Sequence, residues 1–262
     1  NMRKSKHKYG KHFRHYVMLY EPKNGKTTKK NVIIYIHGGG WQFSKPQAYE
    51  PNAQEWINEG YTVFLPCHRR IPFYDYEDLR KDLNLILLKI QELMKERDIG
   101  HLNMIIGGMS SGANLAALMG LNSLILNDLN INSNQISGLF LLGAPVNLAL
   151  MRPSPSVYFF AGNKGGSKFK KANPIEYLNE NHSLPILGIH GTKDGFVEFE
   201  SALSFYEKLN EINPESLTFH QMNGITHLET AGWSFLKNGV QELLINWLEA
   251  QEKNTTFESL NA

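Results

Sequence analysis

The stretch MIIGGMSSGANLA, residues 104–116, decides the fold of this chain. Its first residues are apolar, which is typical of a buried strand, and the alanines and leucines after Gly112 favour a helix. Between them, residues 108–112 read GMSSG and fit the pattern G-x-S-x-G. In that pattern the serine, here Ser110, occupies a sharp strand-to-helix turn that exposes its hydroxyl group above a sheet. The same residues also fit a plain glycine-rich turn with Ser111 as helix N-cap, so the rest of the chain has to decide.

Hydrophobic periodicity on both sides of this turn predicts strands that alternate with helices. The expected strands cover residues 12–20, 31–38, 61–68, 102–110, 136–145, 184–191 and 216–222. The expected helices cover part of residues 46–60 and residues 75–97, 111–126, 198–211 and 235–253. This alternation predicts the α/β class, with a mostly parallel central sheet and helices on both of its faces.

Two segments depart from this rhythm. Residues 148–183 are rich in Pro, Gly, Ser and Lys, and an excursion of that length in a compact domain predicts a small lid or insertion. Residues 1–11 are crowded with Lys and Arg and are expected to form a flexible basic N-terminus. Because no segment has the composition of a domain linker, residues 1–262 are expected to form a single domain.

The overall composition is that of an ordinary soluble globular protein, with 42% hydrophobic residues, 20% charged residues and a net charge of +2. Nothing in this balance demands nucleic acid as a partner. No run of about 18 apolar residues occurs, so no stable membrane insertion is expected. The single cysteine, Cys67, excludes an internal disulfide framework, and a cytoplasmic location is the default expectation. We expect a small-molecule partner and neither metal nor cofactor, and we allow for a homodimer.

A serine hydroxyl becomes a good nucleophile only when a base accepts its proton and an acid orients that base. In folds built around G-x-S-x-G these partners follow the serine in the order acid, then histidine. Asp194 comes just after the strand expected at 184–191, and His227 just after the strand expected at 216–222. Both are therefore expected beside Ser110 at the carboxyl edge of the sheet, where open α/β sheets bind their ligands.

Other histidines and acids fit these roles less well. His37 precedes the serine, which is the wrong order, and His190 lies in a strand end, where it is expected to orient the Asp194 loop. Asp128 falls between elements, and Glu198 begins a helix, where a capping role suffices. The assignment given above is therefore favoured.

Residues 37–41 read HGGGW and directly follow the apolar run VIIYI. Glycine loses more conformational entropy on folding than any other residue, so a run of three glycines is expected to have a function that offsets this cost. Attack on an ester carbonyl creates an oxyanion, which needs backbone N–H donors that no side chain blocks. The glycine run and the N–H of Ser111 are expected to supply such donors. A phosphate-binding loop fits poorly, since neither G-x-G-x-x-G nor G-x-x-x-x-G-K-[ST] occurs at this turn.

Over residues 30–250 the chain resembles the α/β-hydrolases of the HGGG-carrying esterase and lipase group, which includes hormone-sensitive-lipase-like esterases and aryl formamidases. HGGGW resembles the oxyanion motif of that group, GMSSGANLA its nucleophile turn, and HGTKDGFVEFESALSFYEKL its acid loop and following helix. The resemblance implies an α/β-hydrolase fold in which the nucleophile, acid and base are Ser110, Asp194 and His227. It further implies that the oxyanion-hole donors are Gly39, Gly40 and Ser111.

The chain departs from this group near the expected pocket. CHRRIP, residues 67–72, stands where many relatives have Y-R-L-A-P, so Arg70 is expected either to favour a polar or acidic substrate or to have a neutral surface role. Trp41, beside the oxyanion turn, is expected in the pocket wall or the core. Tyr158, in the lid, is expected to contact substrate or to anchor the lid.

The favoured hypothesis is a serine carboxylic ester hydrolase that acts on small esters with short acyl chains through an acyl-enzyme. An aryl formamidase or a carbohydrate acetyl esterase carries the same motifs and remains an alternative. A third alternative is a non-catalytic ligand-binding protein with a hydrolase fold, because fold alone does not give function. Such proteins usually lack a member of the triad, whereas all three residues are present here.

Overall fold

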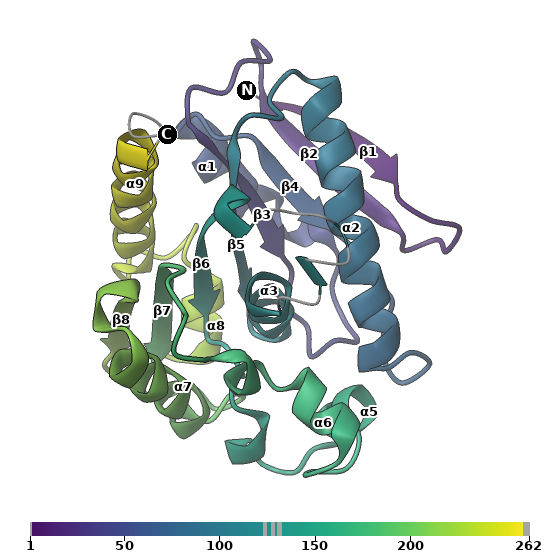
Figure 1. Cartoon of the computed structure of the whole chain (residues 1–262), viewed down its shortest axis with the longest axis vertical. Helices are drawn as coiled ribbons and strands as arrows, with labels where there is room; N and C mark the ends of the chain where they lie inside the picture. Colours follow the sequence, from purple (N-terminus) through teal and green to yellow (C-terminus); the bar gives the residue numbers. More distant parts are fainter. Residues whose placement is uncertain (1, 123–124, 127–128, 130–132, 259–262) are drawn as a thin grey trace.

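The computed structural model describes residues 2–122, 125–126, 129 and 133–258, and within them eight strands form one sheet (Figure 1). The strands are β1 (Met2–Lys8), β2 (Tyr16–Pro22), β3 (Asn31–Ile36), β4 (Val63–Pro66), β5 (Asn103–Met109), β6 (Ile136–Leu142), β7 (Ile186–Gly191) and β8 (Leu217–Met222). Their order across the sheet is β1-β2-β4-β3-β5-β6-β7-β8. β2 pairs antiparallel with β1 and β4, whereas the other neighbouring pairs are parallel. The predicted mostly parallel sheet is confirmed.

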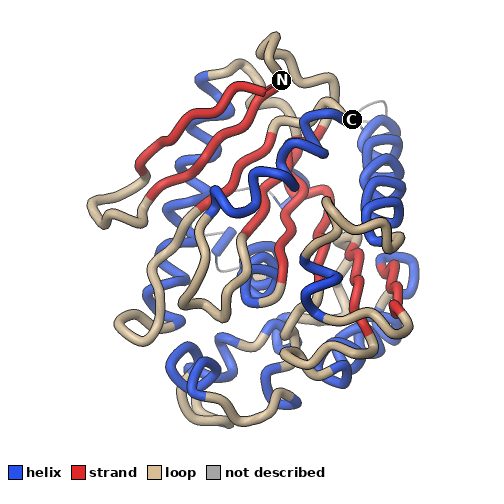
Figure 2. The backbone as a smooth tube through the Cα atoms, turned by 180° about the vertical axis from the view of Figure 1, so that it is seen from behind, coloured by secondary structure: helices blue, strands red, loops and turns tan. Residues whose placement is uncertain are grey.

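Helices cover both faces of the sheet, as predicted. The α-helices are α1 (Glu50–Asn58), α2 (Tyr76–Glu96), α3 (Ser111–Leu121), α5 (Pro155–Ala161), α6 (Ser167–Ala172), α7 (Phe199–Ile212), α8 (His227–Ala231) and α9 (Val240–Glu258). Short 3₁₀ helices are η1 (Pro46–Tyr49), η2 (Ser133–Gln135), η3 (Leu148–Leu150), η4 (Pro174–Tyr177) and η5 (Pro214–Ser216). Figure 1 shows α2, α3 and α7 in front of the sheet, and Figure 2 shows the opposite face from behind. On that face α1 and α9 share one hydrophobic cluster.

The central strand β3 shows how the sequence builds a core on each face. Successive side chains of a strand point to opposite faces, so a strand that is buried on both sides is continuously apolar. Ile34 joins the cluster that contains α2, α3 and α7, whereas its neighbours Ile33 and Tyr35 join the cluster that contains α1 and α9. The apolar run before the glycines is therefore a strand buried between two helical layers.

The boundaries of several elements differ from the predicted ones by a few residues. The strand expected at 12–20 is β2 at Tyr16–Pro22, and the helix expected at 235–253 is α9 at Val240–Glu258. The helix expected over 111–126 is α3 as far as Leu121, and residues 123–124 lie outside the described residues.

The prediction of a flexible N-terminus is wrong for residues 2–8, because they form the edge strand β1. This strand pairs with β2 along its whole length, from Met2 opposite Pro22 to Lys8 opposite Tyr16. Its cationic side chains find partners: Lys4 pairs with Glu50 at 3.0 Å, and the Lys6 ammonium lies 3.9 Å above the ring of Tyr16. This edge strand tolerates such charge because none of its residues is buried.

Residues 148–183, which the sequence predicts to be a small lid or insertion, contain the helices α5 and α6. Phe160 of α5 and Phe169 of α6 are buried in the same cluster as α2 and α3, so the insertion contributes to the core. In Figure 1 the insertion lies at the bottom, past the end of the sheet to which α3 is joined.

Candidate active site

Ser110 occupies the corner between β5 and α3. Its backbone has φ 56° and ψ −126°, a conformation that a residue with a side chain rarely adopts. Such strain costs on the order of 1–3 kcal/mol and persists only where surrounding contacts fix the backbone. Here the Ser110 N–H donates to the Leu142 carbonyl at 2.8 Å, and its carbonyl accepts from the Ala113 N–H at 2.9 Å. The turn is therefore the sharp strand-to-helix corner that G-x-S-x-G predicts.

The two glycines of this motif permit a close approach of α3 to the sheet. A Cβ atom on Gly112 would lie 2.1 Å from the carbonyl oxygen of Ile36, and one on Gly108 would lie 2.5 Å from the Gly112 backbone. No larger residue fits at either position without moving the backbone. The spacing of the motif therefore follows from packing.

Asp194 lies on the loop after β7, and its two carboxylate oxygens have different partners. Oδ1 accepts from the backbone N–H groups of Phe196 at 2.9 Å and Val197 at 2.8 Å. Oδ2 lies 2.6 Å from Nδ1 of His227. The side chain of Asp194 is fully buried. One oxygen thus fixes the loop while the other faces the histidine.

His227 is held in place by its position at the start of α8. Thr226 caps this helix: its hydroxyl accepts from the Glu229 N–H at 3.4 Å, while Glu229 Oε2 accepts from the Thr226 N–H at 2.8 Å. This reciprocal capping box fixes the first turn, and with it the direction of the His227 side chain.

The electrostatics of the pair determine which nitrogen of His227 carries the proton. Burial alone would raise the pKa of Asp194, but the hydrogen bond and charge of His227, with the N–H groups of Val197 and Phe196, hold that pKa below its usual 3.8. Asp194 is therefore ionised at neutral pH and can only accept hydrogen bonds. Nδ1 of His227 must then carry a proton, so that in the neutral imidazole Nε2 is the acceptor.

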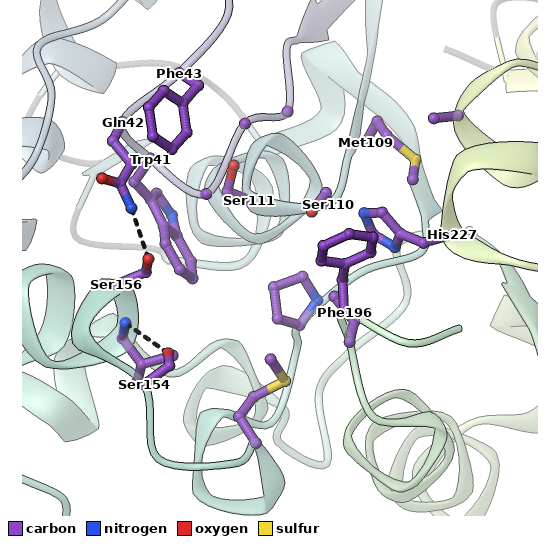
Figure 3. A pocket seen from close by; sticks show the side chains of 18 of the residues that line it. Trp41, Gln42, Phe43, Met109, Ser110, Ser111, Ser154, Ser156, Phe196 and His227 are labelled. Carbon is purple, nitrogen blue, oxygen red and sulfur yellow. Dashed lines mark hydrogen bonds between the residues drawn. The ribbon is translucent and has the colours of Figure 1, made fainter. Parts of the chain in front are cut away.

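Ser110 and His227 line one cavity of about 540 Å³. Figure 3 shows the imidazole of His227 directed toward the side chain of Ser110. The residues that line this cavity are Gly38, Gly39, Gly40, Trp41, Gln42, Phe43, Tyr49, Met109, Ser110, Ser111, Pro145, Met151, Ser154, Ser156, Val157, Phe196, Val197, His227, Leu228 and Ala231. The three oxyanion-hole candidates Gly39, Gly40 and Ser111 are among them.

The glycine run forms a tight turn above this cavity. Gly39 has φ 122° and Gly40 φ 59°, values that glycine adopts at little cost. The Gly39 carbonyl accepts from the N–H groups of Gln42 at 3.1 Å and Phe43 at 2.8 Å. Both glycines line the cavity, so the backbone of this turn borders it.

Two stacked histidines lie behind the glycine turn. The rings of His37 and His68 are 4.8 Å apart and almost parallel, and His37 Nδ1 donates to the Gly38 carbonyl at 2.9 Å. Burial, together with the neighbouring His68, lowers the pKa of His37 to about 3. Burial lowers the pKa of His68 to about 4, against the opposing effects of the Arg69 carbonyl and Asp82. Both rings are therefore neutral at neutral pH, and the turn rests on an uncharged stack.

Two of the three predicted pocket residues lie elsewhere. Trp41 lines the cavity, but Tyr158 and Arg70 are not among the described residues that line it. Tyr158 is 55% exposed and contacts the ring of Phe159 on the outer side of α5. Arg70 follows His68 on the loop after β4, behind the glycine turn, where it contributes to the lowered pKa of both buried histidines.

Sequence reasoning missed the apolar residues that follow the acid and the base. Phe196 comes two residues after Asp194 and Leu228 directly after His227, and both line the cavity. The Phe196 ring lies 5.4 Å from the His227 ring. Their only signal in the sequence was their position within two residues of Asp194 or His227.

The rival acids and bases have other partners. His190 Nε2 donates to the Val197 carbonyl at 3.2 Å and lies 3.5 Å from Asp194 Oδ2, so it contacts the acid loop as expected. Glu198 makes no capping hydrogen bond with its side chain and instead pairs with Arg152 of the insertion. Asp128 lies outside the described residues.

Neither a metal centre nor a membrane span is found in the part of the chain that the structure describes. No group of three or more His, Cys, Asp or Glu side chains there is arranged to hold a metal ion. No described helix is both long and apolar enough to cross a bilayer.

Solved structures of several esterases resemble this chain. A truncated carbohydrate esterase from gut microbiota superposes with a TM-score of 0.81 over 95% of both chains, at 18% identity. Esterase B from Lactobacillus rhamnosis, inhibited with a tributyrin phosphonate, gives 0.79 over 100% of this chain and 89% of that chain, at 14% identity. A thermophilic esterase from Thermogutta terrifontis gives 0.73 over 94% of this chain and 91% of that chain, at 18% identity. These likenesses confirm the predicted α/β-hydrolase fold.

The comparison with protein families gives a closer placement. The family model described as BD-FAE matches residues 17–209, which is more than half of the chain. The chain therefore belongs to the BD-FAE family. No curated protein matches it.

The histidine stack makes stability depend on pH. His68 has a pKa of about 4 in the folded chain and about 6.5 when unfolded, so between these values the unfolded chain binds more protons. Stability from the neutral ring is present above pH 6.5 and is lost as pH falls toward 4, by up to about 3 kcal/mol. In His68→Gln the free energy of unfolding, measured by urea titration from pH 7 to pH 4, should fall less steeply. Equal slopes in both proteins would contradict the assignment of a buried neutral ring.

Proposed function

We propose that this protein is a serine carboxylic ester hydrolase that acts on small esters with short acyl chains. Ser110 is the nucleophile, His227 the general base, and Asp194 the acid that orients it. The observation that carries the proposal is the 2.6 Å contact between Asp194 Oδ2 and His227 Nδ1, because His227 lines the same cavity as the strained Ser110. An Asp or His that is only a solvated loop residue does not form a buried pair of this kind next to a serine.

The mechanism follows from the protonation states. Nε2 of His227 accepts the Ser110 proton as the serine oxygen attacks the ester carbonyl. The negative charge that develops on the carbonyl oxygen is met by the N–H groups of Gly39, Gly40 and Ser111. The imidazolium, stabilised by ionised Asp194, then gives its proton to the leaving alcohol. Water, activated by the same histidine, releases the acid from the acyl-enzyme.

The size and lining of the cavity support small substrates. A volume of about 540 Å³ lies in the lower half of the range of about 300–1,000 Å³ that small-molecule sites enclose. Met109, Pro145 and Val157 give it apolar walls that suit a short acyl chain.

The single cysteine, buried Cys67, supports the further proposal of a cytoplasmic location.

A carbohydrate acetyl esterase is the second candidate. Polar side chains of Gln42, Ser154 and Ser156 line one part of the cavity, where hydroxyl groups of a sugar find hydrogen-bond partners. The structural likeness to a carbohydrate esterase supports the same candidate. An aryl formamidase remains an alternative on the motifs alone.

A fluorophosphonate probe tests whether the site is catalytic. The wild-type protein should be labelled covalently at Ser110, because only an activated serine attacks such a probe. Ser110→Ala should not be labelled, and peptide mass spectrometry locates the modified residue. A wild-type protein that stays unlabelled under conditions that saturate a control esterase would leave only the non-catalytic reading.

A substrate panel separates the acyl hydrolases. We expect kcat/KM to be higher for p-nitrophenyl acetate and butyrate than for the octanoate, because the cavity is small. Acetylated xylose and formylkynurenine are assayed beside them by product release. A preference for acetylated xylose over every aryl ester would select the carbohydrate candidate, and hydrolysis of formylkynurenine alone the formamidase.

Asp194→Asn tests the role of the acid. The asparagine amide favours the wrong tautomer of His227, so turnover of p-nitrophenyl acetate should fall on the order of 10⁴-fold while circular dichroism stays unchanged. Glu198→Gln, at another acid near the same loop, is the matched control and should retain activity within a few-fold. Should Asp194→Asn hydrolyse the ester normally, the role of the acid passes to another residue.

A further inference from the structure

The glycine turn beside Ser110 is attached to the insertion by two separate contacts. The ring of Trp41 stacks on the ring of Phe160 in α5, with centroids 4.3 Å apart and planes 10° from parallel. The next residue, Gln42, donates from Nε2 to the hydroxyl of Ser156, also in α5, at 2.7 Å. Figure 3 shows this hydrogen bond at the side of the cavity opposite His227.

The backbone of Trp41 needs such support. Its φ is 60°, and a bulky residue in this left-handed region is a genuine outlier. The strain persists only if surrounding contacts over-determine the conformation. Trp41 is 4% exposed and Phe160 is fully buried, so the stack is part of the packed interior. The Trp41 carbonyl also accepts from the Ile71 N–H at 3.2 Å, which fixes the turn on its other side.

The insertion is in turn anchored to the rigid part of the fold. Phe160 meets the ring of Tyr76, in the first turn of α2, edge to face at 5.9 Å. Lys168 of α6 pairs with Asp75, the N-cap of α2, at 2.5 Å. The contacts therefore run from α2 through the insertion to the glycine turn.

We propose that Phe160 and Ser156 are positioning residues: α5 holds residues 39–43 in the conformation that aims the Gly39 and Gly40 amides at the carbonyl oxygen of the substrate. This inference rests on the proposed esterase function and assigns the insertion a task besides covering the site. An oxyanion hole works only if its donors are in place before charge develops. Phe160 does not line the cavity among the described residues, so any effect of it on chemistry passes through Trp41.

The first experiment measures the turn without any substrate. Hydrogen–deuterium exchange of the peptide covering residues 37–45 is compared in wild type, Phe160→Leu and Phe159→Leu. Phe159 is the matched control, because it is a half-exposed phenylalanine on the same helix that contacts Tyr158. Exchange should become faster in Phe160→Leu only, since the Gln42 and Phe43 N–H groups are bonded within the turn. Unchanged exchange in Phe160→Leu would overturn the proposal whatever the activity.

The second experiment separates positioning from binding. In Phe160→Leu, kcat for p-nitrophenyl acetate should fall about tenfold or more with KM changed less than about twofold, because a transition-state interaction is lost. The Ki of an acyl trifluoromethyl ketone, whose adduct carries an oxyanion, should rise by the same factor as kcat/KM falls. Phe159→Leu should leave all three values unchanged. A rise in KM alone, or an unchanged Ki, would overturn the proposal.

The smaller variant Ser156→Ala covers the case in which Phe160→Leu fails to fold. It removes the Gln42 hydrogen bond and little volume, and it should accelerate exchange in the same peptide, while Ser156→Thr restores the wild-type rate. If Ser156→Ala leaves the exchange rate of this peptide at the wild-type value, the proposal is overturned in that case. Failure of the esterase function is distinct: wild type would then resist the fluorophosphonate probe, while exchange still reports whether α5 holds the turn.

Discussion

The contact between the end of β3 and the start of α3 is the constraint on which the site depends. A Cβ atom on Gly112 would lie 2.1 Å from the Ile36 carbonyl oxygen, and one on Gly38 would lie 2.9 Å from the Met109 carbonyl oxygen. These approaches lock the glycine turn, which leaves β3, against the corner that bears Ser110, which leaves β5. The spacing between the backbone that leaves β3 and the Ser110 corner is therefore set by the sheet.

Burial decides which groups around Asp194 carry charge. His190 lies 3.5 Å from the carboxylate, but burial lowers its pKa, so that it is neutral at neutral pH and does not compete with His227 as a cation. The charge of Asp194 is thus available to stabilise the imidazolium that forms on His227 in the proposed mechanism.

The sequence predicted what depends on element order and missed what depends on side-chain direction. Ser110, Asp194 and His227 each follow a strand, and parallel strands bring their carboxyl ends to one edge, so their proximity follows from the order alone. Tyr158 and Phe160 are both aromatic, and composition does not distinguish them. Two residues along a helix correspond to a rotation of about 200°, which places Phe160 inward and Tyr158 outward.

The edge strand was missed for a different reason. Lysine and arginine depress both hydrophobicity and periodicity, so a pattern search reads residues 2–8 as a tail, although backbone pairing with β2 requires neither property. When a charged segment can pair with a neighbouring strand, its composition therefore does not indicate whether the segment is ordered or flexible.

That same strand has a consequence for colloidal behaviour. The outer edge of β1 presents unpaired backbone groups, which are a template for growth of the sheet by further molecules. A second copy of the chain that paired antiparallel with this edge, centred on Lys6, would bring Lys6 opposite Lys6 and Lys4 opposite Lys8. Mutual repulsion thus opposes stacking of molecules edge to edge, and the cost rises as the ionic strength falls.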